Sequence, residues 1–218
     1  MHSNIIVVAQ PRSGGVVSTQ VLNRIYPSHK NLNEHFNCHR YGYNINDQLI
    51  SAHEQQPFIV KVSYFDLKEF IVAGETYKNV FDELVKFAAD WYHVTRTNPV
   101  EMVCSSYLSS ITGIFHLDKN ELHTPLSNVI IDKGFVEWFF SKDNYGGWYY
   151  NLASNVPFLD NINYKAIKYN DSITPSEIYM QLTGNKQKIK LGIQKLYPNK
   201  DTTIKNLKEV TEWVTDYV

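Results

Sequence analysis

The sequence predicts an α/β fold, in which residues 1–218 form a single domain with a mainly parallel central sheet flanked by helices. Apolar runs of strand length recur along the chain, helical stretches separate them, and no internal repeat or Gly/Ser/Pro-rich linker divides the 218 residues. Right-handed crossovers are expected to join such strands, so that ligands bind at the carboxyl ends of the strands.

Strands and helices are expected to alternate along the chain. The expected strands are residues 4–9, 58–63, 91–96 and 164–169. The expected helices are residues 16–25, 44–55, 65–72, 77–88, 99–114, 134–153 (broken by Gly146-Gly147), 175–183, 186–195 and 203–216. Tyr26-Pro27 ends the first helix, because proline cannot continue it. The polar segment 28–43 and the segment 115–133 are expected to be irregular.

Composition and charge exclude several classes of protein. With 43% apolar residues the chain can bury a substantial core, and a net charge of −1 draws it neither to nucleic acid nor to anionic lipid. The longest apolar runs are strand-sized and no signal-peptide pattern opens the chain, so we expect a soluble, cytoplasmic protein without a membrane span. Cys38 and Cys104 indicate reduced thiols rather than a disulfide framework. The oligomeric state is left open.

The first expected strand leads directly into Pro-Arg-Ser-Gly-Gly at residues 11–15. At such a corner the unpaired N–H groups of the next helix attract anions, and Gly14 and Gly15 let the main chain approach phosphate-like oxygens closely. Arg12 adds a planar fork of donors, and Ser13 and Ser18 offer hydroxyls. No Gly-Lys-Ser/Thr follows, so magnesium-dependent handling of ATP or GTP lacks its usual ligands. The alternative is an ordinary tight turn with a surface arginine.

Pro11-Arg12-Ser13-Gly14 resembles the phosphosulfate-binding loop of the sulfotransferase family, which reads Pro-Lys/Arg-Ser-Gly-Thr-Thr after the first strand. The resemblance implies the P-loop-like sulfotransferase fold and a donor, 3′-phosphoadenosine 5′-phosphosulfate (PAPS). The 5′ end of this donor would lie in the loop, with Arg12 stabilising charge on the transferring sulfuryl group. Gly15 replaces the first of the family's hydroxyl residues and is followed by Val16 and Val17, so backbone donors, that of Val16 included, or Ser18 would substitute.

A second anion site is expected at the end of the strand 91–96. The stretch from Arg96 through Asn98-Pro99 to Ser105 resembles the family's 3′-phosphate motif, in which a strand ends in Arg and Asn-Pro precedes a helix bearing Ser. Arg96 lies one residue upstream of the usual place, which Thr97 occupies. Arginine and serine at this spacing can converge on one phosphate; the alternative is a plain Asn-Pro helix start with Ser105 facing solvent.

The catalytic base is expected in the loop after the first helix. The family's second strand ends Lys-Thr-His, with histidine as the base, whereas Val60-Lys61-Val62-Ser63 keeps only the lysine, and serine is not basic near neutral pH. The segment 32–36, Leu-Asn-Glu-His-Phe, resembles a glutamate-bearing segment of bacterial members. Glu34 is therefore the candidate base, His35 the second candidate, and Lys61 would neutralise the bridging oxygen. A solvated carboxylate and an edge-strand lysine are the alternatives.

The spacing of Glu34, His35, Cys38 and His39 is compatible with a zinc site. No second Cys/His pair lies nearby in the sequence, so no metal is expected.

Aromatic residues are concentrated at positions 135–150. They could line a cleft for a sugar ring or an aromatic acceptor, with core packing as the alternative: Phe135, Trp138, Phe139, Phe140, Tyr145, Trp148, Tyr149 and Tyr150. Tyr169-Asn170-Asp171 resembles the end of the family's late strand, Tyr-Glu-Asp, without a catalytic role.

The sequence therefore predicts a sulfotransferase that moves a sulfuryl group from PAPS to a hydroxyl, or to an amine, of a small-molecule or carbohydrate acceptor. In-line displacement would depend on positioning and charge neutralisation, without a metal. The alternatives are a nucleotide or small-molecule kinase with a degenerate phosphate loop, and a non-catalytic nucleotide-binding relative that kept the fold.

Overall fold

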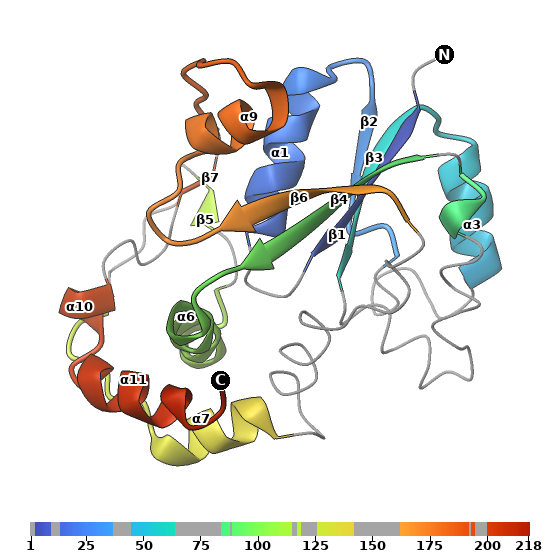
Figure 1. The fold of residues 1–218 in the computed structure, drawn as a ribbon. Helices are drawn as coiled ribbons and strands as arrows, with labels where there is room; N and C mark the ends of the chain where they lie inside the picture. The colour runs from blue at the N-terminus through green and yellow to red at the C-terminus, as the bar shows by residue number, and fades with distance from the viewer. Residues whose placement is uncertain are drawn as a thin grey trace.

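The centre of the protein is a five-stranded, all-parallel sheet with the strand order β2-β3-β1-β4-β6 (Figure 1). The computed structural model describes residues 3–9, 14–36, 45–63, 84–87, 89–114, 117–118, 126–141, 162–191, 193–194 and 200–218. The strands are Asn4–Ala9 (β1), Lys30–Asn33 (β2), Phe58–Ser63 (β3), Ala89–Arg96 (β4) and Tyr164–Tyr169 (β6). The predicted α/β fold with a parallel sheet flanked by helices is confirmed.

The helices connect and cover these strands. They are Gly15–Ile25 (α1), Ile45–His53 (α3), Pro99–Thr112 (α6), Lys133–Phe140 (α7), Pro175–Thr183 (α9), Lys200–Thr203 (α10) and Leu207–Thr215 (α11). Two short strands, Leu117–Asp118 (β5) and Ile193–Gln194 (β7), form a separate antiparallel pair. The start of α6 is set by Asn98, whose side chain accepts from the backbone N–H groups of Val100 and Glu101.

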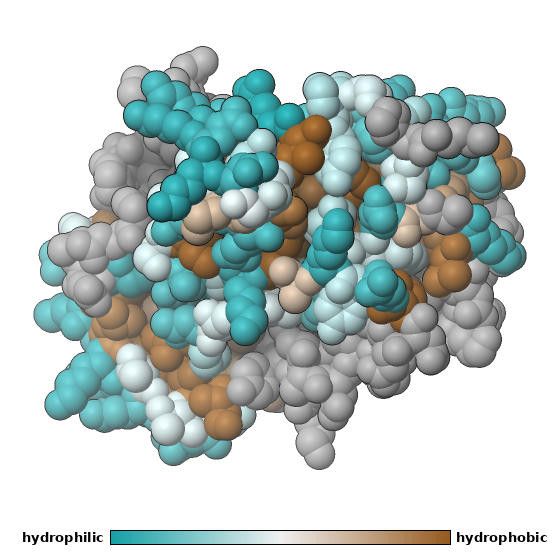
Figure 2. All heavy atoms as spheres, turned by 45° about the horizontal axis from the view of Figure 1, so that its top comes forward, coloured by the Kyte–Doolittle hydropathy of each residue, from teal (hydrophilic) through white to brown (hydrophobic). Residues whose placement is uncertain are grey.

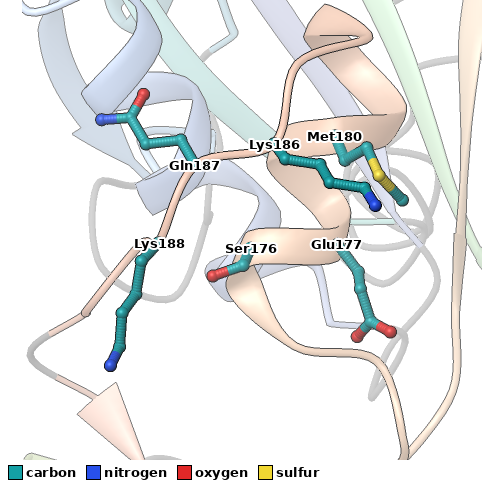
Figure 3. A pocket seen from close by; sticks show the side chains of 6 residues that line it. All are labelled: Ser176, Glu177, Met180, Lys186, Gln187 and Lys188. Carbon is teal, nitrogen blue, oxygen red and sulfur yellow. The ribbon is translucent and has the colours of Figure 1, made fainter.

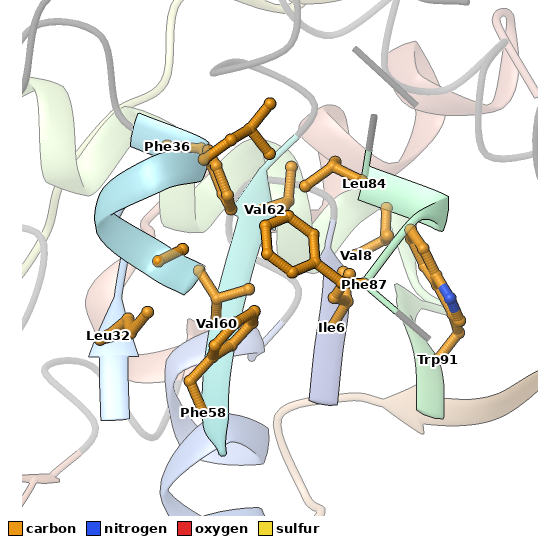
Figure 4. Close-up of a cluster of buried hydrophobic side chains, with 12 residues drawn as sticks. Ile6, Val8, Leu32, Phe36, Phe58, Val60, Val62, Leu84, Phe87 and Trp91 are labelled. Carbon is orange, nitrogen blue, oxygen red and sulfur yellow. The ribbon is translucent and has the colours of Figure 1, made fainter. Parts of the chain in front are cut away.

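Both faces of the sheet are buried at β1 and β3, which explains why β1 is apolar at consecutive positions. Ile5 and Val7 face the layer that contains α1 and α9, which lie side by side in Figure 1. Ile6 and Val8 face the opposite layer, where Figure 4 shows them packed with Phe58 and other buried side chains. Fully burying such a side chain contributes roughly 1.5–3 kcal/mol, so β1 is firmly held in the middle of the fold.

A third apolar cluster lies beyond the carboxyl ends of β4 and β6. It joins α6, α7 and α11, which lie together in Figure 1. Met102 and Leu108 from α6 pack there with Phe139 from α7 and Val210 from α11. The C-terminal part of the chain is thereby attached to the end of the sheet where ligands are expected.

Two expectations about secondary structure were wrong. Residues 30–33 form β2 within the segment expected to be irregular. The sequence did not indicate this edge strand because only Leu32 is buried and the other three residues are polar. Residues 185–191 form no helix, contrary to the helix expected at 186–195, and residues 193–194 form β7. Lys186, Lys188 and Lys190 are exposed and alternate with half-buried Ile189 and Leu191, a pattern typical of an extended segment.

Other boundaries differ more modestly from the expected ones. The helix expected at 134–153 ends at Phe140, and residues 142–153 lie outside the described residues. The helix expected at 203–216 is divided into α10 and α11. Residues 65–72 and most of 77–88 also lie outside the described part of the chain.

Helices in the described part of the chain are too short or too polar to cross a lipid bilayer.

His93 gives the fold a predictable sensitivity to acid. Its side chain lies in the middle of β4, is 5% exposed and makes an edge-on contact with Tyr164. Burial lowers the pKa of His93 from 6.5 to about 4, so the native state keeps the ring neutral. Between these two values the unfolded chain binds a proton that the folded chain does not, and stability therefore falls as the pH falls.

We expect His93→Phe to reduce this loss of stability with acid. The wild-type free energy of unfolding should fall more steeply between pH 6.5 and 4.5 than that of the variant, by up to about 1.4 kcal/mol per pH unit. Urea unfolding at three pH values across this range measures both slopes. Parallel slopes for the two proteins would show that His93 is not neutralised by burial.

Candidate functional site

The order of the strands places two predicted anion sites side by side. From β1 the chain passes through α1 to β2, toward one edge of the sheet, whereas from β4 it passes through α6 toward β6 at the other edge. Adjacent strands whose connections leave in opposite directions mark the place where parallel α/β sheets bind ligands. Gly14 and Gly15 follow β1, and Arg96 ends β4, so both lie at this switch point.

The first turn of α1 offers backbone donors without a side-chain cap. Gly14 occupies the N-cap position, no side chain there accepts a hydrogen bond from the helix, and the first turn carries no acidic residue. In α6, by contrast, Asn98 fills this role. The N–H groups of a first helical turn have no partner within the helix and, together with the helix dipole, favour an anion. Residues 10–13, with Arg12 and Ser13, lie outside the described residues.

Both glycines are required by close neighbours. Gly14 has a φ of +81°, and a Cβ built there would lie 2.5 Å from Cγ and Cε2 of Tyr169. A Cβ at Gly15 would lie 2.7 Å from the Cβ of Ala9 and 3.0 Å from the Cδ of Lys61. Any larger residue would therefore push α1 away from the sheet.

Ser18 lies one turn into α1 and carries the hydroxyl that was predicted to substitute for the family's hydroxyl residues. Its side chain is fully buried, and its hydroxyl has no hydrogen-bond partner among the described residues. Side chains in a helix lean toward its N-terminus, and Ser18 is one turn away from Gly14, whose carbonyl accepts from its backbone N–H at 2.9 Å. Val16, whose N–H was predicted to act as a donor, is half-buried in the same first turn.

Lys61 and Glu34 form an ion pair beside this helix start. Lys61 is in register with Val7 and so lies on the face of the sheet that α1 covers, with its stem packed beneath Gly15. Its Nζ donates to Oε1 of Glu34, which directly follows β2. The two side chains are 11% and 23% exposed. The fold thus brings together three predicted site residues, Gly15, Glu34 and Lys61, from three separate elements.

His35, the second candidate base, is directed toward α3 and not toward Lys61. Its Nε2 forms a 2.9 Å hydrogen bond with the backbone carbonyl of Gln48 in α3, and its ring contacts Phe36 edge-on. This bond ties His35 to α3, while its neighbour Glu34 is directed toward Lys61.

Arg96 lies in a network of buried charges. Its Nε donates to Oε2 of Glu101 at 3.2 Å, and its Nη2 donates to Oδ1 of Asp171. Lys200 completes the network with its Nζ 3.6 Å from Oδ2 of Asp171. The Arg96 side chain is 2% exposed. These bonds tie the end of β4 to α6, to the residues after β6 and to α10.

Burial sets the protonation of two groups at this network. Burial raises the pKa of the Cys104 thiol to about 12, which keeps it protonated and unreactive. Burial also lowers the pKa of Lys200, an effect that the carboxylate of Asp171 opposes. Ser105, the predicted phosphate ligand, is half-buried on α6, and its carbonyl accepts from the hydroxyl of Ser109 at 2.7 Å.

Tyr169, to which sequence reasoning attached no catalytic role, is a neighbour of both predicted anion sites. Its ring faces Gly14, and the guanidinium of Arg96 lies over it, 5.7 Å from the centroid. Asp171 was noted only as part of the resemblance to the family's late strand, and Glu101 was not singled out. The signal that could have indicated them is position, because residues at the carboxyl ends of neighbouring parallel strands meet at one edge of the sheet.

The predicted aromatic cluster divides in the structure. Phe139 and Phe140 are buried in the cluster of α6, α7 and α11, where they serve packing. Phe135 is half-buried and contacts Tyr107, whereas Trp138 is 42% exposed. Its other members, Tyr145, Trp148, Tyr149 and Tyr150, lie outside the described residues.

A separate hollow of about 400 Å³ lies against α9 (Figure 3). It is lined by Ser176, Glu177, Met180, Lys186, Gln187 and Lys188. The ammonium groups of Lys186 and Lys188 point in different directions in Figure 3, so they do not converge on one ligand. The face shown in Figure 2 is mainly hydrophilic, with its apolar side chains in separate areas.

No metal centre emerges from the described residues, among which no three His, Cys, Asp or Glu side chains are grouped to hold an ion. Cys38 and His39, part of the zinc alternative, lie outside them.

Comparison with protein-family models, with curated proteins and with solved structures found no match.

The ion pair of Glu34 and Lys61 should contribute measurably to stability. In a double-mutant cycle with Glu34→Gln, Lys61→Met and the combined variant, we expect a coupling energy of about 1 kcal/mol, because both side chains are largely buried. Urea unfolding of the four proteins at low and high salt measures it. Effects of the two substitutions that simply add would show that the pair is not formed in solution.

Proposed function

We propose that this protein transfers a sulfuryl group from PAPS to a hydroxyl group of a small-molecule or carbohydrate acceptor. One observation carries the proposal: Gly15, Lys61 and Glu34, which the family resemblance assigns to donor loop, charge neutralisation and base, lie together at the start of α1. They come from the β1–α1 corner, from β3 and from the residue after β2. Lysine and glutamate are rarely buried in proteins, so the packing of a parallel sheet does not itself require this pair beside α1.

The 5′ end of the donor is assigned to the first turn of α1. Its anionic oxygens would accept from the N–H groups of residues Gly14 to Val16, and Ser18 has a buried hydroxyl without a partner among the described residues. Arg12, in the preceding loop, is assigned to the sulfuryl group, where a permanent planar cation stabilises developing charge. Ser13 completes the loop as a further donor.

The reaction is an in-line displacement at sulfur. The acceptor oxygen forms a bond to sulfur while the bond between sulfur and the bridging oxygen of the donor breaks, and adenosine 3′,5′-bisphosphate leaves with the bonding electrons. Glu34 takes the proton of the acceptor hydroxyl and releases it to solvent, and Lys61 neutralises the negative charge on the departing oxygen. Because the acceptor oxygen and the departing oxygen lie on opposite sides of sulfur, Glu34 and Lys61 must give up their mutual contact for each to serve one end of the displacement.

The 3′-phosphate of the donor is assigned to Arg96 and Ser105. Glu101 and Asp171 already hold the guanidinium, so a phosphate must compete with two carboxylates for it. Lys200 lies in the same network and adds a second positive charge. A doubly charged phosphate is better suited to this competition than a neutral group, since its oxygens bind arginine in the same bidentate manner as a carboxylate.

The proposal predicts that the 3′-phosphate matters for binding. We expect adenosine 3′,5′-bisphosphate to raise the midpoint of thermal unfolding more than AMP does, and ATP with magnesium to give no larger rise, because only a sulfotransferase requires the 3′-phosphate. Arg12→Ala and Arg96→Ala should each weaken the binding of adenosine 3′,5′-bisphosphate, as measured by calorimetry. Equal effects of AMP and the bisphosphate would contradict the Arg96 assignment, and a preference for ATP with magnesium would favour the kinase alternative.

Glu34→Gln should separate binding from turnover. The amide keeps the size of the side chain but cannot accept the proton, so we expect bisphosphate binding to stay within about twofold while sulfate transfer falls about 100-fold or more. Glu54→Gln, at an exposed carboxylate just after α3, serves as the matched control and should leave both unchanged. Transfer from labelled PAPS across a panel of acceptors measures the rate. A fully active Glu34→Gln protein would place the base elsewhere, and binding without any transfer by the wild type would favour the non-catalytic alternative.

A further inference from the structure

Tyr169, the last residue of β6, lies against both parts of the proposed donor site. Its side chain is 5% exposed, which is unusual for this strand, because four of the six residues of β6 are exposed. The ring packs closely against Gly14, at the start of α1, and its centroid lies 5.7 Å from the guanidinium of Arg96, at the end of β4. The ring is therefore a neighbour both of the place assigned to the 5′ end of the donor and of the place assigned to its 3′-phosphate.

The contact with Gly14 is too close for any other residue. A Cβ on Gly14 would lie within 2.5 Å of three ring carbons of Tyr169, and the backbone of Gly14 has the left-handed conformation that favours glycine. The start of α1 is thus pressed against the ring itself. A change in the position of the ring would move the first turn of α1, whose N–H groups are the proposed donors to the 5′ end.

The ring also has a fixed neighbour in Arg96. Arg96 and Tyr169 are register partners in the β4–β6 pair, so their side chains leave the same face of the sheet at the same level. The guanidinium lies over the ring, and the carboxylate that holds it belongs to Asp171, two residues after Tyr169. Cation and ring stabilise each other in this arrangement.

We propose that Tyr169 is a positioning residue of the donor site, which sets the separation between the Gly14 corner and Arg96. This inference rests on the proposed function and adds to it how the two anion sites are kept in register. A ligand with phosphate at both ends gains affinity from the second phosphate only when both sites are at the correct distance. The ring, which touches both sites, determines that distance.

The test compares two ligands in three variants. Tyr169→Phe keeps the ring and should bind adenosine 3′,5′-bisphosphate and AMP as the wild type does, within about twofold. Tyr169→Leu removes the ring, and we expect the affinity for the bisphosphate to fall about tenfold or more while that for AMP falls less, so that the preference for the bisphosphate shrinks. Tyr164→Leu, at the exposed start of the same strand, is the control and should keep the preference. Calorimetry at constant salt measures all affinities.

A role limited to stability would lower the unfolding temperature without changing the ratio of the two affinities, and that result would overturn the inference. If Tyr169→Leu does not fold, Gly14→Ala tests the same contact from the other side, because its methyl group must displace the ring. Gly14→Ala should then lower the ratio as well, and an unchanged ratio would again overturn the inference. Failure of the wild type to bind the bisphosphate at all would refute the proposed function and the inference together, so the two failures are distinguishable.

Discussion

The approach of the β1–α1 corner to the sheet is the constraint on which the rest of the site depends. Gly14 and Gly15 bring the start of α1 so close to Tyr169, Ala9 and Lys61 that no side chain fits at either position. Because β1 is buried on both faces in the middle of the sheet, the corner cannot shift to relieve these contacts. The backbone N–H groups of the first turn are thereby held next to a buried lysine, an arrangement suited to an anion.

Two sets of paired charges surround this corner and differ in character. Lys61 and Glu34 form a simple pair whose side chains are 11% and 23% exposed. Arg96 belongs to a denser network with Glu101, Asp171 and Lys200, which also ties α6 and α10 to the sheet. Removing one member of such a network leaves an uncompensated buried charge, so the Arg96 network stabilises the fold in addition to any role in binding.

The sequence was sufficient for the fold class, and it indicated Glu34 and Lys61, two residues of the candidate site that the fold brings into contact. Apolar runs locate β1 and β3 because both are buried throughout, whereas β2 escaped notice because it buries one side chain. Motif reasoning identified Glu34 and Lys61 separately, but their contact depends on strand order, which a local pattern does not contain. Tyr169 and Asp171 were missed as site neighbours for the same reason, since their partners lie about 70 residues or more away along the chain.

A crystal structure with adenosine 3′,5′-bisphosphate would test the central claim most directly, because it shows which groups the two phosphates contact. The account predicts the 5′-phosphate at the backbone N–H groups that follow Gly14, within hydrogen-bonding distance of Lys61, and the adenosine extending past Tyr169 toward Arg96. A bisphosphate bound elsewhere, for example against the exposed Lys186 and Lys188 beside α9, would contradict it.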